Sequence, residues 1–189
     1  MQQEHFLLKE LENYSPFDQS EQIACHQLRY FLTHDKNPYD RENIIAHVVA
    51  DAWVINPSKT HVLLMFHSYK NFWMTPGGHC DGNPNVLESA IREVWEETGL
   101  KINIDQPRVL FDVNTGYVPQ KEKAHGIEPE HLHFDICYLL EGDDTAVLSP
   151  NEESSELKWI PLSELDQYKV MDCHTRRILK TKQKWAEKE

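Results

Sequence analysis

The segment from Asn83 to Gly99 constrains the fold more than any other, because its residue pattern specifies a helix with two unlike faces. Asn83 suits an N-cap and the proline after it suits the first helical turn, while Gly99 suits a helix end. The apolar residues at helical spacing on one face are Val86, Leu87, Ala90, Ile91, Val94 and Trp95. A helix with one apolar face buries it against the rest of a folded domain, so we predict a packed helix here.

The other face of this helix carries three acidic side chains, Glu93, Glu96 and Glu97. Their i, i+3, i+4 spacing places them within about 100° of arc, because each helical residue turns the chain by about 100°. Each like-charged pair costs roughly 0.2–0.5 kcal/mol on an exposed helix, and a bound divalent cation relieves that repulsion. Carboxylate oxygens suit Mg²⁺ or Mn²⁺, which proteins commonly share with substrate phosphates. We therefore expect all three to be metal ligands; the alternative is a solvated acidic face.

Two glycines, Gly77 and Gly78, precede the helix and allow the backbone to approach a ligand closely. Together with the helix they resemble the signature box of the Nudix hydrolases, G-x5-E-x7-R-E-U-x-E-E-x-G-U, where U is aliphatic. The matching positions are Gly78, Arg92, Glu93, Val94, Glu96, Glu97, Gly99 and Leu100. The sequence departs from the box at Pro84, where the family usually has glutamate. The flanking segments resemble a bacterial subgroup of the family, and the resemblance extends from about Leu11 to Leu165.

The resemblance implies a hydrolase that uses Mg²⁺ or Mn²⁺ to cleave the diphosphate bond of a nucleoside diphosphate derivative or a related small molecule. Its catalytic residues would be Arg92, Glu96, Glu97 and Glu153. The general base is one of these glutamates or another in the loop 151–153. Pro84 favours an alternative function, a catalytically weak Nudix-fold module that binds or senses a ligand.

The expected substrate contacts are Gly77, Gly78, His79, Tyr117 and His133. Residues 114–130 form a predicted loop that is too long for a simple connection, and Tyr117 in it could stack on a base. The strand after it begins with His131, His133 and Asp135 on one face. His133 could donate a hydrogen bond to a phosphate or sugar oxygen. This H-x-H-x-D run is similar to the zinc-binding run of the metallo-β-lactamase fold but lacks its second ligand pair, which favours a role in the substrate pocket.

The rest of the pattern predicts an α/β fold, and the resemblance implies a Nudix-type α/β/α sandwich with a mixed sheet. The predicted strands cover residues 44–55, 61–66, 72–75, 108–113, 131–140 and 157–160. Helices over residues 4–13 and 19–33 form an N-terminal helical extension spanning residues 1–42. Residues 43–189 then form the Nudix domain, which ends in a basic, exposed helix over residues 172–187.

The charge and cysteine content of the chain limit the binding partners and the compartment that we expect for it. The net charge of -12, from 31 acidic and 19 basic residues, argues against a binder of nucleic-acid polymers or of anionic membranes. The four scattered cysteines, Cys25, Cys80, Cys137 and Cys173, predict free thiols in the cytoplasm, with Cys80 a small buried hydrophobe. His47 and His67 are expected to be structural. We find no signal peptide or transmembrane segment and expect a cytoplasmic monomer or homodimer that acts on a small-molecule diphosphate.

Overall fold

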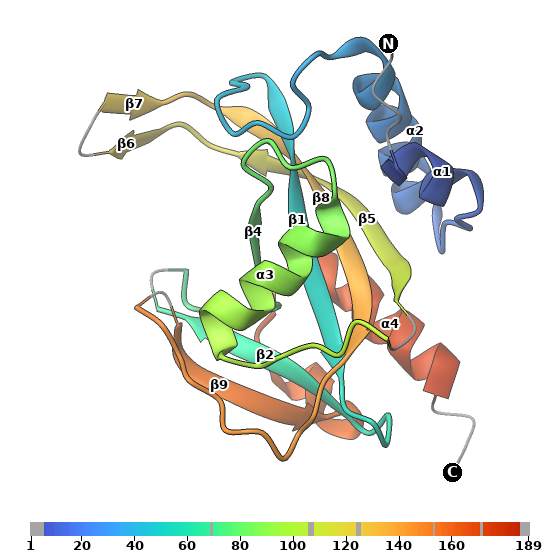
Figure 1. Ribbon diagram of the computed structural model, residues 1–189, viewed down its shortest axis with the longest axis vertical. Helices are drawn as coiled ribbons and strands as arrows, with labels where there is room; N and C mark the ends of the chain where they lie inside the picture. The colour runs from blue at the N-terminus through green and yellow to red at the C-terminus, as the bar shows by residue number, and fades with distance from the viewer. Residues whose placement is uncertain are drawn as a thin grey trace. The chain divides into compact units, whose positions relative to one another are not determined.

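The computed structural model describes residues 6–68, 70–105, 108–123, 126–152, 154–170 and 172–185 (Figure 1). The chain divides into two compact units, each built from three segments. Unit 1 contains residues Met1–Ala50, Gly78–Ser89 and Asp112–Ile136. Unit 2 contains residues Asp51–Gly77, Ala90–Phe111 and Cys137–Glu189.

The main sheet has seven strands, and its path runs β3-β2-β1-β8-β5, with β4 paired to β1 and β9 paired to β2. The strands of this sheet are β1 Ala46–Ile55, β2 His61–His67, β3 Phe72–Met74, β4 Gly77–His79, β5 Val109–Val118, β8 His131–Glu141 and β9 Ser154–Pro161. A separate two-stranded sheet pairs β6 Lys121–Lys123 with β7 Gly126–Glu128. The α/β class with a mixed sheet and N-terminal helices, as predicted from the sequence, is confirmed.

Unit 1 begins with helices α1 Phe6–Glu12 and α2 Gln19–His34. Asp18 caps α2, since its side chain accepts a hydrogen bond from the backbone N–H of Glu21. The side chain of Glu21 is buried and in turn accepts from the backbone N–H of Val113 at 3.0 Å. Phe31 of α2 also stacks on Phe134 of β8. These contacts hold the two helices in the fold of unit 1.

Unit 2 has an apolar core formed by strands, a short helix and the C-terminal helix. Its members are Trp53, Ile55, Val62, Leu64, Phe111, Cys137, Leu139, Ile160, Leu165 and Ile178. β2 pairs antiparallel with β9, from the pair of His61 with Pro161 to the pair of His67 with Ser154. The 3₁₀ helix η1 Leu162–Gln167 and helix α4 Asp172–Trp185 follow.

The prediction that the C-terminal helix is exposed is wrong, although its existence is confirmed. The side chain of Arg177 is fully buried in unit 2 and donates to Asp51 at 2.7 Å and to Thr75 at 3.1 Å. His174 is buried as well and accepts from the backbone N–H of Thr75 at 3.1 Å. Arg177 and His174 are therefore satisfied by protein partners rather than by water.

Three local predictions also change. Residues 114–130 are not a loop, because β5 continues to Val118 and the β6–β7 hairpin follows; His125 lies outside the described residues. The helix α3 Val86–Thr98 starts after Asn85 rather than Asn83, since the Asn85 side chain accepts from the backbone N–H of Glu88 at 3.2 Å. Trp95 was expected on the packed face, but its side chain is 56% exposed.

The structure shows no helix, among the residues it describes, that is both long and apolar enough to cross a membrane. All four cysteines carry free thiols, and Cys80 is buried as expected. The division into an extension over residues 1–42 and a domain over residues 43–189 stays a prediction.

Candidate functional site

Arg92 lies among the acidic side chains of α3 in unit 2. Its guanidinium group contacts Glu93 at 2.8 Å and Glu96 at 2.7 Å. The Glu93 side chain is 12% exposed and that of Glu96 is 44% exposed, so the two carboxylates differ in their access to water. Partial burial acts to lower the pKa of Arg92, but the two carboxylates outweigh it and raise that pKa above its ordinary value. Arg92 thus offsets part of the repulsion within the acidic face.

Glu97 is the most deeply buried of the three glutamates of the acidic face. Its side chain is 5% exposed, and Oε2 accepts a hydrogen bond from the backbone N–H of Gly77 at 2.8 Å. The segment that carries Gly77 is anchored in unit 2, because the carbonyl of Pro76 accepts from the backbone N–H of Ala52 at 3.0 Å. The first glycine of the pair therefore brings its peptide N–H to the last glutamate of the trio.

The donor set of Glu93, Glu96 and Glu97 fits Mg²⁺ or Mn²⁺ in chemistry, because it consists of carboxylate oxygens alone. Among the described residues, however, the three carboxylates do not form a group whose ligand atoms all lie within 4.8 Å of one another. In this arrangement Glu93 and Glu96 contact Arg92, and Glu97 accepts from Gly77. A cation at this face would compete with the guanidinium for two of its ligands.

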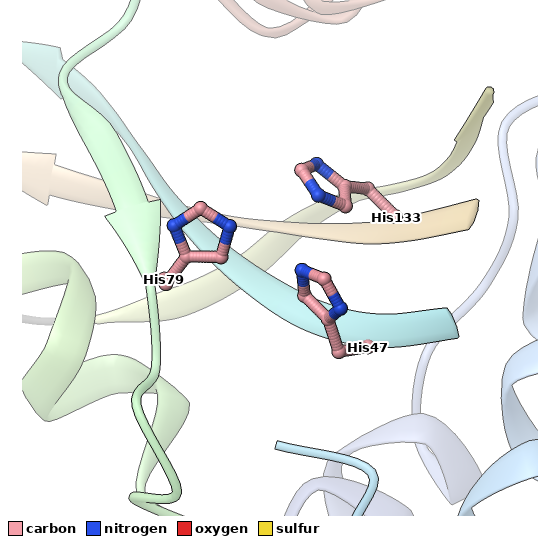
Figure 2. Close-up of side chains that lie close together, drawn as sticks. All are labelled: His47, His79 and His133. Carbon is pink, nitrogen blue, oxygen red and sulfur yellow. The ribbon is translucent and has the colours of Figure 1, made fainter. Parts of the chain in front are cut away.

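Unit 1 contains a second group of candidate ligands, and this group consists of histidines. His47 of β1, His79 of β4 and His133 of β8 place one ring nitrogen each within 4.8 Å of the others. Figure 2 shows the three side chains together. The ring centroids lie 5.1 Å apart for His47 and His79, 4.6 Å for His47 and His133, and 5.4 Å for His79 and His133. We call these three residues the histidine cluster.

His47 is the most deeply buried member of the histidine cluster, at 2% exposure. Burial lowers the pKa of its imidazole, although a hydrogen bond to the Asn43 carbonyl acts in the opposite direction. His131 adjoins the cluster, with its ring centroid 4.9 Å from that of His47. The neutral form of His47 is therefore favoured.

The other predicted site residues have separate surroundings. Tyr117 is 63% exposed and donates its hydroxyl to Glu130 at 2.6 Å, which raises the pKa of the phenol. Asp135 accepts from the side-chain amide of Asn114 at 3.0 Å. Glu153 lies outside the described residues.

The structure thus brings together some of the predicted residues and adds one that sequence reasoning placed elsewhere. Arg92 forms ion pairs with Glu93 and Glu96. Gly77 donates a hydrogen bond to Glu97, and the ring of His79 contacts that of His133 edge-on. His47 was expected to be structural, yet it lies between two expected substrate contacts. In the sequence, His47 is visible only as a histidine near the start of a strongly apolar strand. The sequence does not reveal which strands pair with that strand.

Comparison with known proteins places this fold in a family. The model for the NUDIX domain matches residues 45–181. A probable DHNTP pyrophosphohydrolase from Lactococcus lactis is 34% identical over 103 residues, which are 53% of this chain and 55% of that protein. An RNA pyrophosphohydrolase from Pelagibacter ubique is 27% identical over 135 residues, covering 67% of this chain and 84% of that protein. The match to the Lactococcus protein therefore spans about half of that relative's length.

A solved structure supports the same assignment at the level of the fold. The NUDIX domain of Shewanella oneidensis NrtR, complexed with ADP ribose, superimposes with a TM-score of 0.55 at 17% identity. The superposition covers 82% of this chain and 97% of that domain. With the family match over residues 45–181 and the residues of the signature box in α3, this chain belongs to the Nudix family.

Proposed function

We propose that this chain is a Nudix pyrophosphohydrolase that uses Mg²⁺ or Mn²⁺ to cleave the diphosphate bond of a nucleoside diphosphate derivative or a related small molecule. The observation that carries the proposal is the buried carboxylate of Glu97, which is fixed by the peptide N–H of Gly77 on a helix that also presents Glu93 and Glu96. Burying a charged carboxylate is costly unless it is both hydrogen-bonded and paired with positive charge, and a cation bound at Glu97 would supply such charge. Membership in a family of typical pyrophosphohydrolases supports the same reading.

In the proposed reaction, the oxygen of a water molecule forms a bond to one phosphorus while the bond from that phosphorus to the bridging oxygen breaks. The bridging oxygen leaves with the second phosphate, and the water gives its proton to a carboxylate. Glu93, Glu96 and Glu97 are the proposed metal ligands. A cation bound there supplies positive charge to the phosphate oxygens and Lewis acidity toward the attacking water. The protein contributes position and charge rather than covalent chemistry.

The proposed role of Arg92 is to hold Glu93 and Glu96 until substrate and cation bind, and then to contribute its own positive charge. Its two short ion pairs support this role, because both partners belong to the proposed ligand set. The general base must accept a proton within hydrogen-bond reach of the water. Glu96 is a candidate because it is the more exposed partner of Arg92. Glu97 and Glu153 remain the other candidates.

We propose that the backbone of Gly77 and Gly78 lies against the substrate, together with His79, Tyr117 and His133. The open, aromatic surface of Tyr117 supports stacking on a base, since its ring is 63% exposed. The further expectations from the sequence belong to the same proposal. They are a cytoplasmic protein, a monomer or homodimer, a small-molecule substrate, and a Nudix domain over residues 43–189.

A screen of nucleoside diphosphate derivatives with Mg²⁺ or Mn²⁺ tests the proposal, with released phosphate measured after an added phosphatase. The expected result is metal-dependent turnover of at least one compound by the parent chain. A Glu93→Gln variant is expected to lose that turnover, whereas Glu156→Gln, at an exposed glutamate of β9 in the same unit, is expected to retain it. Tight binding of a compound without turnover under any metal condition would instead support the ligand-sensing alternative that Pro84 suggests.

A further inference from the structure

We propose that His47, His79 and His133 form a binding site for a zinc-type transition-metal ion in unit 1. This site uses none of the carboxylates of α3, and the proposal stands whether or not the proposed hydrolysis is found. It rests on three observations: the convergence of three rings, the partners of the second nitrogens of His47 and His133, and the burial of one unpartnered nitrogen of His47.

The convergence follows from strand pairing. β4 pairs with β1, and β8 is the neighbour of β1 in the sheet, so three adjacent strands contribute one histidine each. The rings of His47, His79 and His133 turn toward a common space in Figure 2. Among the described residues, this is the group of three or more potential ligands whose donor atoms lie within 4.8 Å of one another.

A hydrogen bond at Nδ1 orients the ring of His47. A backbone carbonyl can only accept, so Nδ1–H of His47 donates to the carbonyl of Asn43 at 3.2 Å. The lone pair of the neutral ring is then on Nε2. Metal-binding histidines usually donate their other ring N–H to such a carbonyl, which fixes the tautomer. The loop that supplies the carbonyl is itself fixed, because the Asn43 side chain donates to Asp35 at 2.9 Å.

The buried Nε2 atom of His47 is the independent observation that points to a ligand. It is shielded from solvent and finds no hydrogen-bond partner among the described residues. A buried polar atom left without a partner costs free energy, because the atom has lost its hydrogen bonds to water and gained none in the protein. A metal ion in the centre of the histidine cluster would occupy that lone pair and remove this cost.

Two successive hydrogen bonds orient the ring of His133. Nδ1–H of His131 donates to the carbonyl of Pro129 at 2.8 Å, which leaves the lone pair of the neutral ring on Nε2. That atom lies 3.1 Å from Nε2 of His133, which therefore acts as the donor. The lone pair of neutral His133 is then on Nδ1. His131 thus fixes the tautomer of His133 in the same way that the Asn43 carbonyl fixes that of His47.

The donor atoms decide the class of metal. Three imidazole nitrogens suit zinc and other late first-row ions, whereas Mg²⁺ prefers oxygen ligands. Ring nitrogens around a tetrahedral zinc ion lie about 3.3 Å apart, given Zn–N bonds of about 2.0–2.1 Å. The ring nitrogens of the histidine cluster lie within 4.8 Å of one another, so the proposal requires the rings to rotate toward the ion. Three protein ligands leave one coordination position open, where a water or a phosphate oxygen could bind.

Metal binding to the chelator-treated full chain tests the site. Zinc is titrated in competition with a chromophoric chelator, and Co²⁺ is added separately to record its visible absorption bands. The variants are His79→Asn and His133→Asn. The controls are His26→Asn, an exposed histidine of α2 in the same unit, and Glu97→Gln on the acidic face. Cys173→Ser serves as a further control. The Cys173 thiol lies 3.2 Å from Nδ1 of His174, so these two atoms are potential zinc ligands outside the histidine cluster.

The expected result is one zinc ion per chain and the spectrum of tetrahedral Co²⁺ without a sulfur charge-transfer band. Each cluster variant is expected to weaken zinc binding more than about 100-fold, since loss of even an outer partner of a ligand costs about 10–100-fold. The three controls are expected to bind as the parent does. His79 is only half-buried, so His79→Asn decides the matter if His133→Asn fails to fold. The proposal is overturned by absence of zinc binding, by unchanged binding in His79→Asn, or by its loss in Cys173→Ser.

Discussion

The backbone N–H of Gly77 donates to the buried carboxylate of Glu97, 20 residues later in the chain, at a distance of 2.8 Å. This bond joins the first glycine of the pair to the acidic face of α3 within unit 2. Glu97 therefore has a structural role, as acceptor of the Gly77 N–H, and a proposed chemical role, as a metal ligand. Substitutions that separate these two roles are therefore the most informative at this residue.

Replacing Glu97 with alanine is expected to destabilise the fold, whereas replacing it with glutamine is expected to have a small effect. Alanine removes the acceptor of the Gly77 N–H, and a buried donor left without a partner costs about 1–3 kcal/mol. The side-chain carbonyl of glutamine can still accept that bond. Urea unfolding of the two variants measures the difference, and equal stabilities would show that the Gly77–Glu97 bond contributes little.

Glu21 is expected to be essential for docking of the N-terminal helices in unit 1. Its carboxylate accepts from the hydroxyl of Tyr14, from the backbone N–H of Phe17 at 2.6 Å and from that of Val113 at 3.0 Å. Glu21→Ala leaves these donors without their acceptor, so faster trimming of residues 6–34 by limited proteolysis is expected. Glu12→Ala, at an exposed residue of α1, is the matched control. Rapid trimming of the parent chain itself would contradict the docked arrangement.

Arg177→Met is expected to lower the free energy of unfolding by about 3–5 kcal/mol, because it leaves the carboxylate of Asp51 without its buried partner. Lys184→Met, at an exposed residue of the same helix, is expected to change it by less than about 0.5 kcal/mol. Thermal or urea unfolding measures both. Similar small effects from the two substitutions would mean that α4 contributes little to the stability of unit 2.

His133→Ala is expected to affect substrate turnover more than it affects thermal stability. His133 is only partly buried, so the loss of packing is limited, while its proposed contact with substrate is lost entirely. Steady-state kinetics and a melting curve on the same preparation measure both effects. A lower melting temperature with unchanged kinetics of the folded protein would assign His133 a purely structural role.

The elements with a strong local signal were predictable from sequence. The box helix ends at Gly99, whose φ of +70° belongs to the left-handed region that favours glycine after a helix. The strand from His131 was also predicted, because apolar residues recur along it. The start of α3 was misplaced by two residues because Asn83 and Asn85 are both good caps, and only the hydrogen bond from the Glu88 N–H distinguishes them.

The features that sequence reasoning missed depend on partners that lie far away in the chain. Arg177 is buried because Asp51 and Thr75 meet it, and nothing near Arg177 in sequence indicates this. The β6–β7 hairpin pairs short, mostly polar strands, in which Glu122 faces Ile127, so they show no alternation of apolar residues. His47 joins the histidine cluster only through the pairing of β1 with its neighbours.

The rate of metal-dependent phosphate release by Glu97→Gln, relative to the parent chain, decides whether the acidic face of α3 is the catalytic metal site. The measurement uses the best compound from the substrate screen, with Glu156→Gln as the control and unfolding curves for all three proteins. The account predicts that Glu97→Gln keeps its fold but loses more than about 100-fold in rate, since even an outer partner in a metal site is worth about 10–100-fold in activity. A folded Glu97→Gln variant that hydrolyses the compound as fast as the parent would contradict the assignment of this acidic face as the catalytic metal site.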